Sequence, residues 1–111
     1  MTDIVTFISQ YPPETAKAIV GEFGNIAGNS KSEKAIQSAI NCISNYSAEN
    51  AIEILHNITL VSYINYINNH TDSEKAVLYI VEEISKAKTT EDAIKISEET
   101  MQRMRLEQST N

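Results

Sequence analysis

The chain has 111 residues, a mass of 12.4 kDa and a formal net charge of −6 at pH 7, and 41% of its residues are hydrophobic. This length and apolar content suffice for one domain with its own core, and the acidity opposes non-specific binding to phosphate backbones and to anionic lipid. The single cysteine, Cys42, excludes an internal disulfide, and the start of the chain lacks the pattern of a signal peptide, so we expect a cytoplasmic location.

The first two predicted helices meet at a pair of prolines. Thr2 or Asp3 caps a short first helix, Pro12 ends it, and Pro13 serves as the first residue of the next helix. Gly21 and Gly24 within the second helix weaken it or mark where another helix approaches closely. This helix ends at Gly28 and Asn29, and we expect it to bury Ala16, Ile19, Val20, Phe23 and Ala27.

Two capping boxes predict the starts of the third and fifth helices. The first runs from Ser30 to Glu33 and the second from Thr71 to Glu74. The third helix carries an apolar stripe that ends at Ile43, and the fifth carries the most regular stripe of the chain. We expect the members of these two stripes to face the core: Ile36, Ala39, Ile40 and Ile43, and Val77, Ile80, Val81 and Ile84.

The fourth helix begins after Ser47, can extend to Asn69, and then has a length of about 33 Å. Residues 54–71 include no Asp, Glu, Lys or Arg, and the apolar residues surround the helix axis. A helix that is apolar all round is usually buried, whereas its asparagines argue against a membrane span. We therefore expect a central helix, packed by its neighbours or covered in part by a second subunit.

The sixth helix begins at Thr89 or Thr90 and turns its apolar side chains inward. The last residues of the chain are polar. We expect one helical domain over residues 1–105 and a frayed tail over residues 106–111. The predicted inward residues are Ala93, Ile94, Met101 and Met104.

Three segments of the chain resemble one another. Ile8–Ile19 recurs as Ile43–Ile54 and, with one more residue in the turn, as Ile84–Ile96. Each contains a helix end, a short turn and the next helix start, at the period of roughly 35 to 45 residues that is typical of stacked helical hairpins. The matches indicate either internal duplication or coincidence in a chain rich in Ile, Ser, Asn, Glu and Ala. We predict an all-α fold: a compact bundle of five to six helices, built from about three hairpins around the central helix.

Aromatic and imidazole side chains form a strip on the fourth helix. His56, Tyr63 and His70 recur every seven residues, and Tyr66 lies beside them. The strip is either an interface for a partner helix or for stacked bases, or a half-buried edge of the core whose polar tips reach water. The two histidines cannot share a metal ion, because fourteen residues of helix separate them by about 21 Å.

Other candidate sites are weaker. Glu53 and His56 match the Glu-x-x-His element of di-iron bundles, but the chain has no second such pair. Cys42 has no basic neighbour in sequence to lower its pKa. We predict no catalytic residues, no metal site and no cofactor. A candidate nucleic-acid patch consists of lysines at predicted helix ends: Lys31, Lys34, Lys75, Lys86 and Lys88.

The sequence therefore favours a non-enzymatic protein–protein interaction module: a small assembly subunit, adaptor or inhibitor. Its predicted interface is His56, Tyr63, Tyr66 and His70, and its partner is another protein or a second copy in a homodimer. The alternative is an accessory helical subunit of a nucleic-acid-processing ribonucleoprotein complex, in which the lysines contact nucleic acid only within the larger assembly. A third hypothesis, a metal-binding bundle enzyme, has only Glu53 and His56 in its support. None of these hypotheses involves a membrane.

Overall fold

The computed structural model describes residues 4–69 and 73–109. The predicted caps Thr2, Asp3 and Thr71 and the predicted interface residue His70 lie outside this range. Within it the chain forms α-helices and no strand, which confirms the predicted all-α fold. The helices are α1 (Ile4–Ile8), α2 (Pro13–Asn29), α3 (Glu33–Ile43), α4 (Ala48–Asn69), α5 (Glu74–Ser85) and α6 (Thr90–Ser109).

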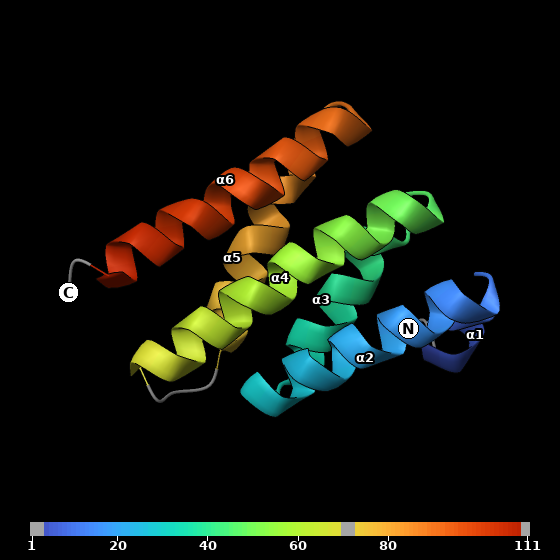
Figure 1. Ribbon diagram of the computed structural model, residues 1–111, viewed down its shortest axis with the longest axis horizontal. Helices are drawn as coiled ribbons and strands as arrows, with labels where there is room; N and C mark the ends of the chain where they lie inside the picture. The colour runs from blue at the N-terminus through green and yellow to red at the C-terminus, as the bar shows by residue number, and fades with distance from the viewer. Residues whose placement is uncertain (1–3, 70–72, 110–111) are drawn as a thin grey trace.

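The helices stack as three hairpins in two layers, as Figure 1 shows. Helices α2, α4 and α6 lie side by side and run in the same direction, and α3 and α5 lie behind them. The three similar sequence segments contain the turns that join α1 to α2, α3 to α4 and α5 to α6. Helix α4 packs against α2, α3, α5 and α6. The hairpins and the central position of the fourth helix are therefore confirmed.

The described helices begin close to their predicted starts, but the N-caps of α3 and α5 are Ser32 and Ser73, each two residues after the first residue of the predicted capping box. Helix α2 begins at Pro13, as predicted. The N-cap of α3 is Ser32, whose Oγ accepts a hydrogen bond from the Ala35 N–H at 3.2 Å. The prediction of Ser30 as this cap is wrong, because Ser30 is buried and its Oγ accepts a hydrogen bond from the Ser32 N–H instead.

The last helix is longer than the sequence indicates. Helix α6 continues to Ser109, so residues 106–109, which we expected in a frayed tail, are helical. The helix also buries Ala93 and Met101, as predicted, and Ile94 and Met104 pack against the core while partly exposed. Across the described residues, none of the helices combines the length and the apolar character that a membrane span requires.

The core is centred on the first two-thirds of α4. Ile54, Leu55 and Ile58 have no exposed surface, and complete burial of such a side chain contributes roughly 1.5–3 kcal/mol. The other long helices each supply fully buried apolar residues, among them Ile19 and Ile26 from α2, Ala35 and Ile43 from α3, Val77 and Ile80 from α5, and Ala93 from α6.

The buried face of α2 differs from the predicted one. Ile19, Phe23 and Ile26 face the core, whereas Val20 and Ala27 are exposed, so the prediction for these last two residues is wrong. Residues 19, 23 and 26 follow helical spacing along one stripe. Val20 and Ala27 lie seven residues apart on a neighbouring stripe that no helix of the described chain covers.

Polar side chains tie the hairpins together inside the bundle. Asn57 on α4 donates a hydrogen bond to Ser97 Oγ on α6 at 2.9 Å, and both residues are buried. The Ser73 hydroxyl donates to the Ser62 carbonyl oxygen at 2.7 Å, and Asn29 Nδ2 donates to Ser62 Oγ at 3.3 Å. Because buried polar groups must find partners, these bonds restrict how α2, α5 and α6 can sit on α4.

Candidate functional site

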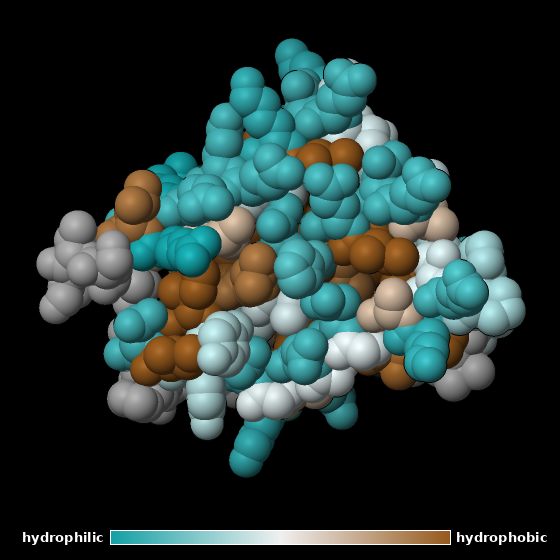
Figure 2. Space-filling model, viewed as in Figure 1, coloured by the Kyte–Doolittle hydropathy of each residue, from teal (hydrophilic) through white to brown (hydrophobic). Residues whose placement is uncertain are grey.

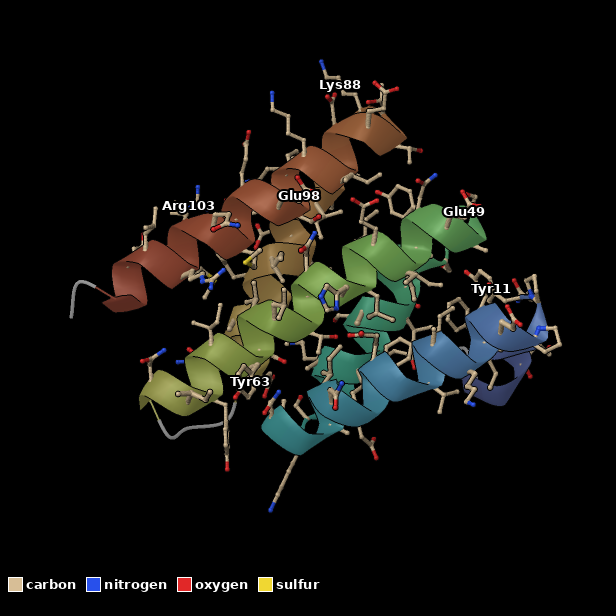
Figure 3. All side chains as sticks on the ribbon, viewed as in Figure 1. Tyr11, Glu49, Tyr63, Lys88, Glu98 and Arg103 are labelled. Carbon is tan, nitrogen blue, oxygen red and sulfur yellow. The ribbon has the colours of Figure 1, made fainter. Side chains whose placement is uncertain are left out.

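The predicted interface residues that the structure describes lie on the exposed side of α4. The exposed fraction is 52% for Tyr63 and 45% for Tyr66, and His56 is also exposed. Ile67, one turn after Tyr63, is 44% exposed. Aromatic and apolar side chains thus gather at the C-terminal end of α4, and Figure 3 places Tyr63 and Glu49 toward opposite ends of this helix.

A groove runs between α2 and α4 beside these residues. It has a volume of about 420 Å³. His56 and Tyr63 belong to its α4 wall, so the structure brings two of the predicted residues to one concave surface. Figure 2 shows hydrophobic side chains reaching the surface in patches on the same face of the molecule. The groove is lined by Glu22, Gly24, Asn25, Gly28, Asn29, His56, Thr59, Leu60 and Tyr63.

The α2 wall of the groove is low because it contains glycines. A Cβ atom added at Gly24 or Gly28 meets no atom within 4 Å, and neither residue has a left-handed backbone. The fold therefore does not require glycine at either position. Each glycine inside a helix nevertheless costs about 0.5–1 kcal/mol relative to alanine. The open wall is thus present at the expense of stability.

One end of the groove holds a carboxylate–imidazole pair. Glu22 Oε1 lies 3.1 Å from His56 Nδ1, and the exposed fractions of the two side chains are 19% and 57%. The second oxygen of Glu22, Oε2, is buried and has no hydrogen-bond partner among the described residues. A buried carboxylate with an unfilled acceptor is an unfavourable arrangement. The pair joins α2 to α4 and leaves Glu22 short of one donor.

The Glu-x-x-His match has a different role from the one that its pattern indicates. His56 contacts Glu22 of α2, and Glu53 is exposed. In the described part of the chain, no three His, Cys, Asp or Glu side chains come together in a way that could hold a metal ion. The geometry of His56 therefore supports a structural or binding role for this residue.

Tyr79 provides a useful contrast to Tyr63 and Tyr66. Tyr79 on α5 is 43% exposed, but Arg103 donates a hydrogen bond to its hydroxyl at 2.7 Å and lies over its ring at 5.9 Å from the ring centre. Among the described residues, the hydroxyls of Tyr63 and Tyr66 have no such partner. The tyrosines of α4 are thus available to an external group.

The five predicted lysines fall into two groups. Lys31 and Lys34 lie at the start of α3, and Lys75 lies at the start of α5. The starts of these two helices are close together, because the Ser73 N–H before α5 donates a hydrogen bond to the Asn29 carbonyl oxygen just before α3. Lys86 and Lys88 lie at the other end of α5, about 16 Å along the helix. Lys86 also forms an ion pair with Glu83 at 2.9 Å. The structure therefore does not bring the five lysines into one patch.

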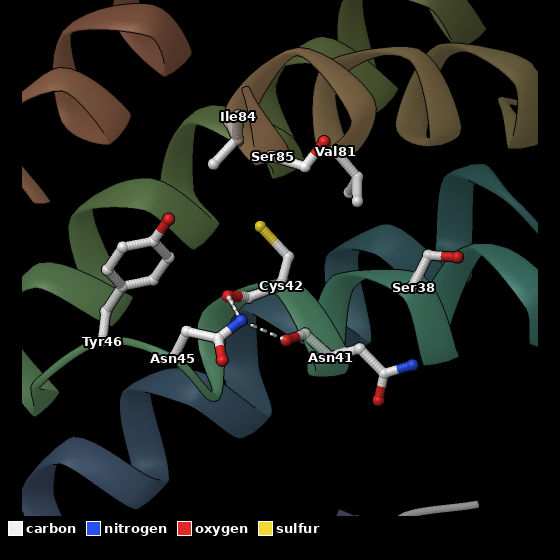
Figure 4. A pocket seen from close by; sticks show the side chains of 8 residues that line it. All are labelled: Ser38, Asn41, Cys42, Asn45, Tyr46, Val81, Ile84 and Ser85. Atoms are coloured by element: carbon white, nitrogen blue, oxygen red, sulfur yellow. Dashed lines mark hydrogen bonds between the residues drawn. The ribbon is translucent and has the colours of Figure 1, made fainter. Parts of the chain in front are cut away.

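Cys42 lines a second pocket, of about 350 Å³, between α3 and α5. Figure 4 shows its sulfur pointing from α3 toward Ile84 and Ser85 of α5. Burial raises the pKa of the Cys42 thiol to about 11, so the thiol stays protonated near neutral pH. Because the thiolate is the reactive form, this arrangement agrees with a packing role for Cys42.

Sequence reasoning identified the α4 wall of the groove and missed the α2 wall. Glu22 and Asn25 line the groove but had no assigned role, and Gly28, which also lines it, was assigned only to the end of the helix. The available signal was the recurrence of glycine in α2, for which we had two interpretations, a weakened helix or a close approach by another helix. In the structure, a Cβ atom added at Gly21 or Gly24 meets no atom of the described residues within 4 Å, so no helix of this part of the chain approaches closely there. Comparison of the chain with protein-family models, with curated proteins and with solved structures finds no significant match. The geometry of the surface is therefore the basis for inferring a function.

Proposed function

We propose that the chain is a non-enzymatic protein–protein interaction module, a small helical assembly subunit, adaptor or inhibitor, whose partner docks on the exposed side of α4. The observation that carries the proposal is the exposed group of Tyr63, Tyr66 and Ile67 at one end of the central helix. We also propose a cytoplasmic location, which the single cysteine supports.

The chemistry of this group suits a protein interface. Tyrosine is enriched at the centres of interfaces because its ring supplies apolar area at low entropic cost and its hydroxyl supplies a hydrogen bond. Residues 54–69 include no Asp, Glu, Lys or Arg, so a partner that covers this stretch desolvates no such side chain on it. Both properties favour protein binding over a purely solvated helix face.

Replacement of Tyr63 and Tyr66 by alanine tests the proposal. The matched control is Tyr79→Ala, because Tyr79 has a similar exposed fraction but lies on α5. We expect Tyr63→Ala/Tyr66→Ala to reduce partner capture by at least roughly tenfold, to leave the circular dichroism spectrum unchanged, and to differ clearly from the control.

Light scattering on the same proteins separates the two kinds of partner. A wild-type mass above that of one chain that falls in the double variant indicates a second copy as the partner. A constant mass with lost capture indicates a different protein. If mass and capture are both unchanged in Tyr63→Ala/Tyr66→Ala, this surface is not the interface.

A further inference from the structure

We infer that the groove between α2 and α4 receives an amphipathic helix of a partner protein, with a basic side chain beside Glu22 and apolar side chains over Gly24, Gly28 and Leu60. The inference rests on the proposed function and specifies the chemistry of the partner. It concerns residues of α2 that the Tyr63 and Tyr66 surface does not include.

The shape of the groove fits a helix. Its walls are two helices that run in the same direction, and its lining extends over eight residues of each, from Glu22 to Asn29 and from His56 to Tyr63. The first and the last of eight helical residues lie about 10 Å, or two turns, apart, which matches the i, i+3, i+4 and i+7 anchors of a helix bound in a groove. The missing side chains at Gly24 and Gly28 let a third helix axis approach closely.

An extended peptide fits less well. Such a segment gains affinity mainly by pairing its backbone with the edge of a sheet, and the described chain contains no strand. A helix satisfies its own backbone hydrogen bonds and needs only side-chain contacts. The occupant is therefore a helix.

The charge of the groove favours a basic occupant. Residues 18–30 and 35–73 include no Lys or Arg, whereas Glu22 lies in the groove and Glu53 lies on α4 one turn before His56. A guanidinium or ammonium group beside Glu22 meets a carboxylate whose Oε1 contacts His56, and no Lys or Arg of these walls competes for it. The other oxygen, Oε2, is buried in this structure and has no hydrogen-bond partner among the described residues. Because the terminal torsion of glutamate is soft, rotation of the carboxylate brings Oε2 toward the partner while His56 keeps Oε1.

A heterologous partner is favoured over a second copy by long-range charge. Each copy carries a formal net charge of −6, so two copies repel one another, whereas a basic helix is attracted and steered to the groove. We therefore assign the groove to a different protein.

A peptide-selection experiment tests the inference. A library of displayed amphipathic helical peptides is selected on the wild-type protein, and the affinities of the enriched peptides are measured by fluorescence anisotropy. We expect enriched peptides to combine an apolar stripe with Lys or Arg. Their affinity is expected to fall roughly tenfold or more in Gly28→Leu, which fills the groove, and several-fold in Glu22→Gln, with a weaker salt dependence.

Matched variants control for indirect effects. Gly21→Leu adds the same side chain to α2 outside the groove lining, and Glu14→Gln removes an exposed charge of α2. Both are expected to bind as the wild type does. If Gly28→Leu fails to fold by circular dichroism, Gly24→Ala replaces it.

The outcomes separate this inference from the proposed function. If no peptide is enriched, or if enriched peptides bind Gly28→Leu and Glu22→Gln as well as wild type, the inference is wrong. In that case loss of partner capture in Tyr63→Ala/Tyr66→Ala still supports the proposed function. A wild-type dimer that Gly28→Leu converts to a monomer shows that a second copy occupies the groove, which also overturns the inference.

Discussion

The two sides of α4 differ in how completely the neighbouring helices α6 and α2 cover them. Toward α6 the contact is filled: Ala93, Ser97 and Met101 are buried, and Ser97 accepts a hydrogen bond from Asn57. The contact between α2 and α4 is packed in the interior, by buried residues such as Ile19. At the surface the same two helices leave the groove open.

The difference lies in the neighbours of α4. Helix α6 packs against α4 along its length, its Ala93, Ser97 and Met101 are buried, and Ser97 is bonded to Asn57 of α4. Helix α2 places Gly24 and Gly28 at the rim, where an added Cβ atom would meet no atom of the described residues within 4 Å. One side of α4 is therefore built for stability, and the other keeps space that stability alone does not require.

The largest expected effect concerns the centre of the filled region. Ile58→Ala removes a side chain with no exposed surface, and we expect a loss of about 2–5 kcal/mol in the free energy of unfolding. Urea denaturation measures it. The control is Ile67→Ala on the same helix, where 44% of the residue is exposed and less than about 1 kcal/mol is expected. Equal losses would contradict the placement of α4.

A second test uses the contact between α3 and α5. Because burial raises the pKa of Cys42 from 9.0 to about 11, the folded protein holds about 100-fold less thiolate at pH 8 than the unfolded chain. Alkylation by iodoacetamide, followed by mass spectrometry, should be slower by at least that factor. Similar rates in the native and the urea-unfolded protein would show that the thiol is not buried.

The same pKa shift predicts the pH dependence of stability. The folded state binds the Cys42 proton more tightly than the unfolded state, so this contribution to stability is complete below about pH 9 and decreases as pH rises toward about 11. In Cys42→Ser the decrease over that interval should be smaller. Thermal unfolding between pH 8 and pH 11 measures the difference, and identical profiles would contradict the raised pKa.

Loss of the polar contact between α4 and α6 should lower the free energy of unfolding by an intermediate amount. Ser97→Ala leaves the buried Asn57 amide without the hydroxyl that accepts its hydrogen bond, and an unsatisfied buried donor costs about 1–3 kcal/mol. Urea denaturation again gives the loss. In the control, Ser85→Ala, an exposed hydroxyl that bonds to Glu82 is removed, and the change should stay below about 0.5 kcal/mol. A loss in Ser97→Ala no larger than the control would show that the buried bond is unimportant.

The smallest predicted effect is a gain. Gly21→Ala and Gly24→Ala each add a methyl group where there is open space, and each should raise the free energy of unfolding by about 0.5–1 kcal/mol. The two variants should gain equally by urea denaturation. A loss in Gly24→Ala alone would mean that the groove is closed in solution.

The sequence predicted the parts of the fold that depend on local patterns. The three similar segments located the hairpin turns, and the uncharged run from Ile54 located the central helix. The stripe of α2 was misjudged because small and apolar residues occur on two neighbouring sides of this helix, and periodicity alone cannot tell which side meets α4. In the folded chain, tertiary packing buries Ile26 and leaves Ala27 exposed.

The candidate site was predictable only where its residues lie on one helix. The exposed tyrosines lie on one helix, so helical spacing grouped Tyr63 with Tyr66. Glu22 joins His56 across 34 positions of the chain, and a single sequence gives no information about that pairing. The role of these residues in partner binding stays a prediction.

The most direct test of the central claim, that α2 keeps its glycines for a docking helix, measures affinity and stability together. The enriched basic helical peptides are titrated against Gly24→Ala and Gly21→Ala. We predict that both variants become more stable and that only Gly24→Ala loses affinity, several-fold or more. Equal affinity of the two variants for these peptides would contradict the claim.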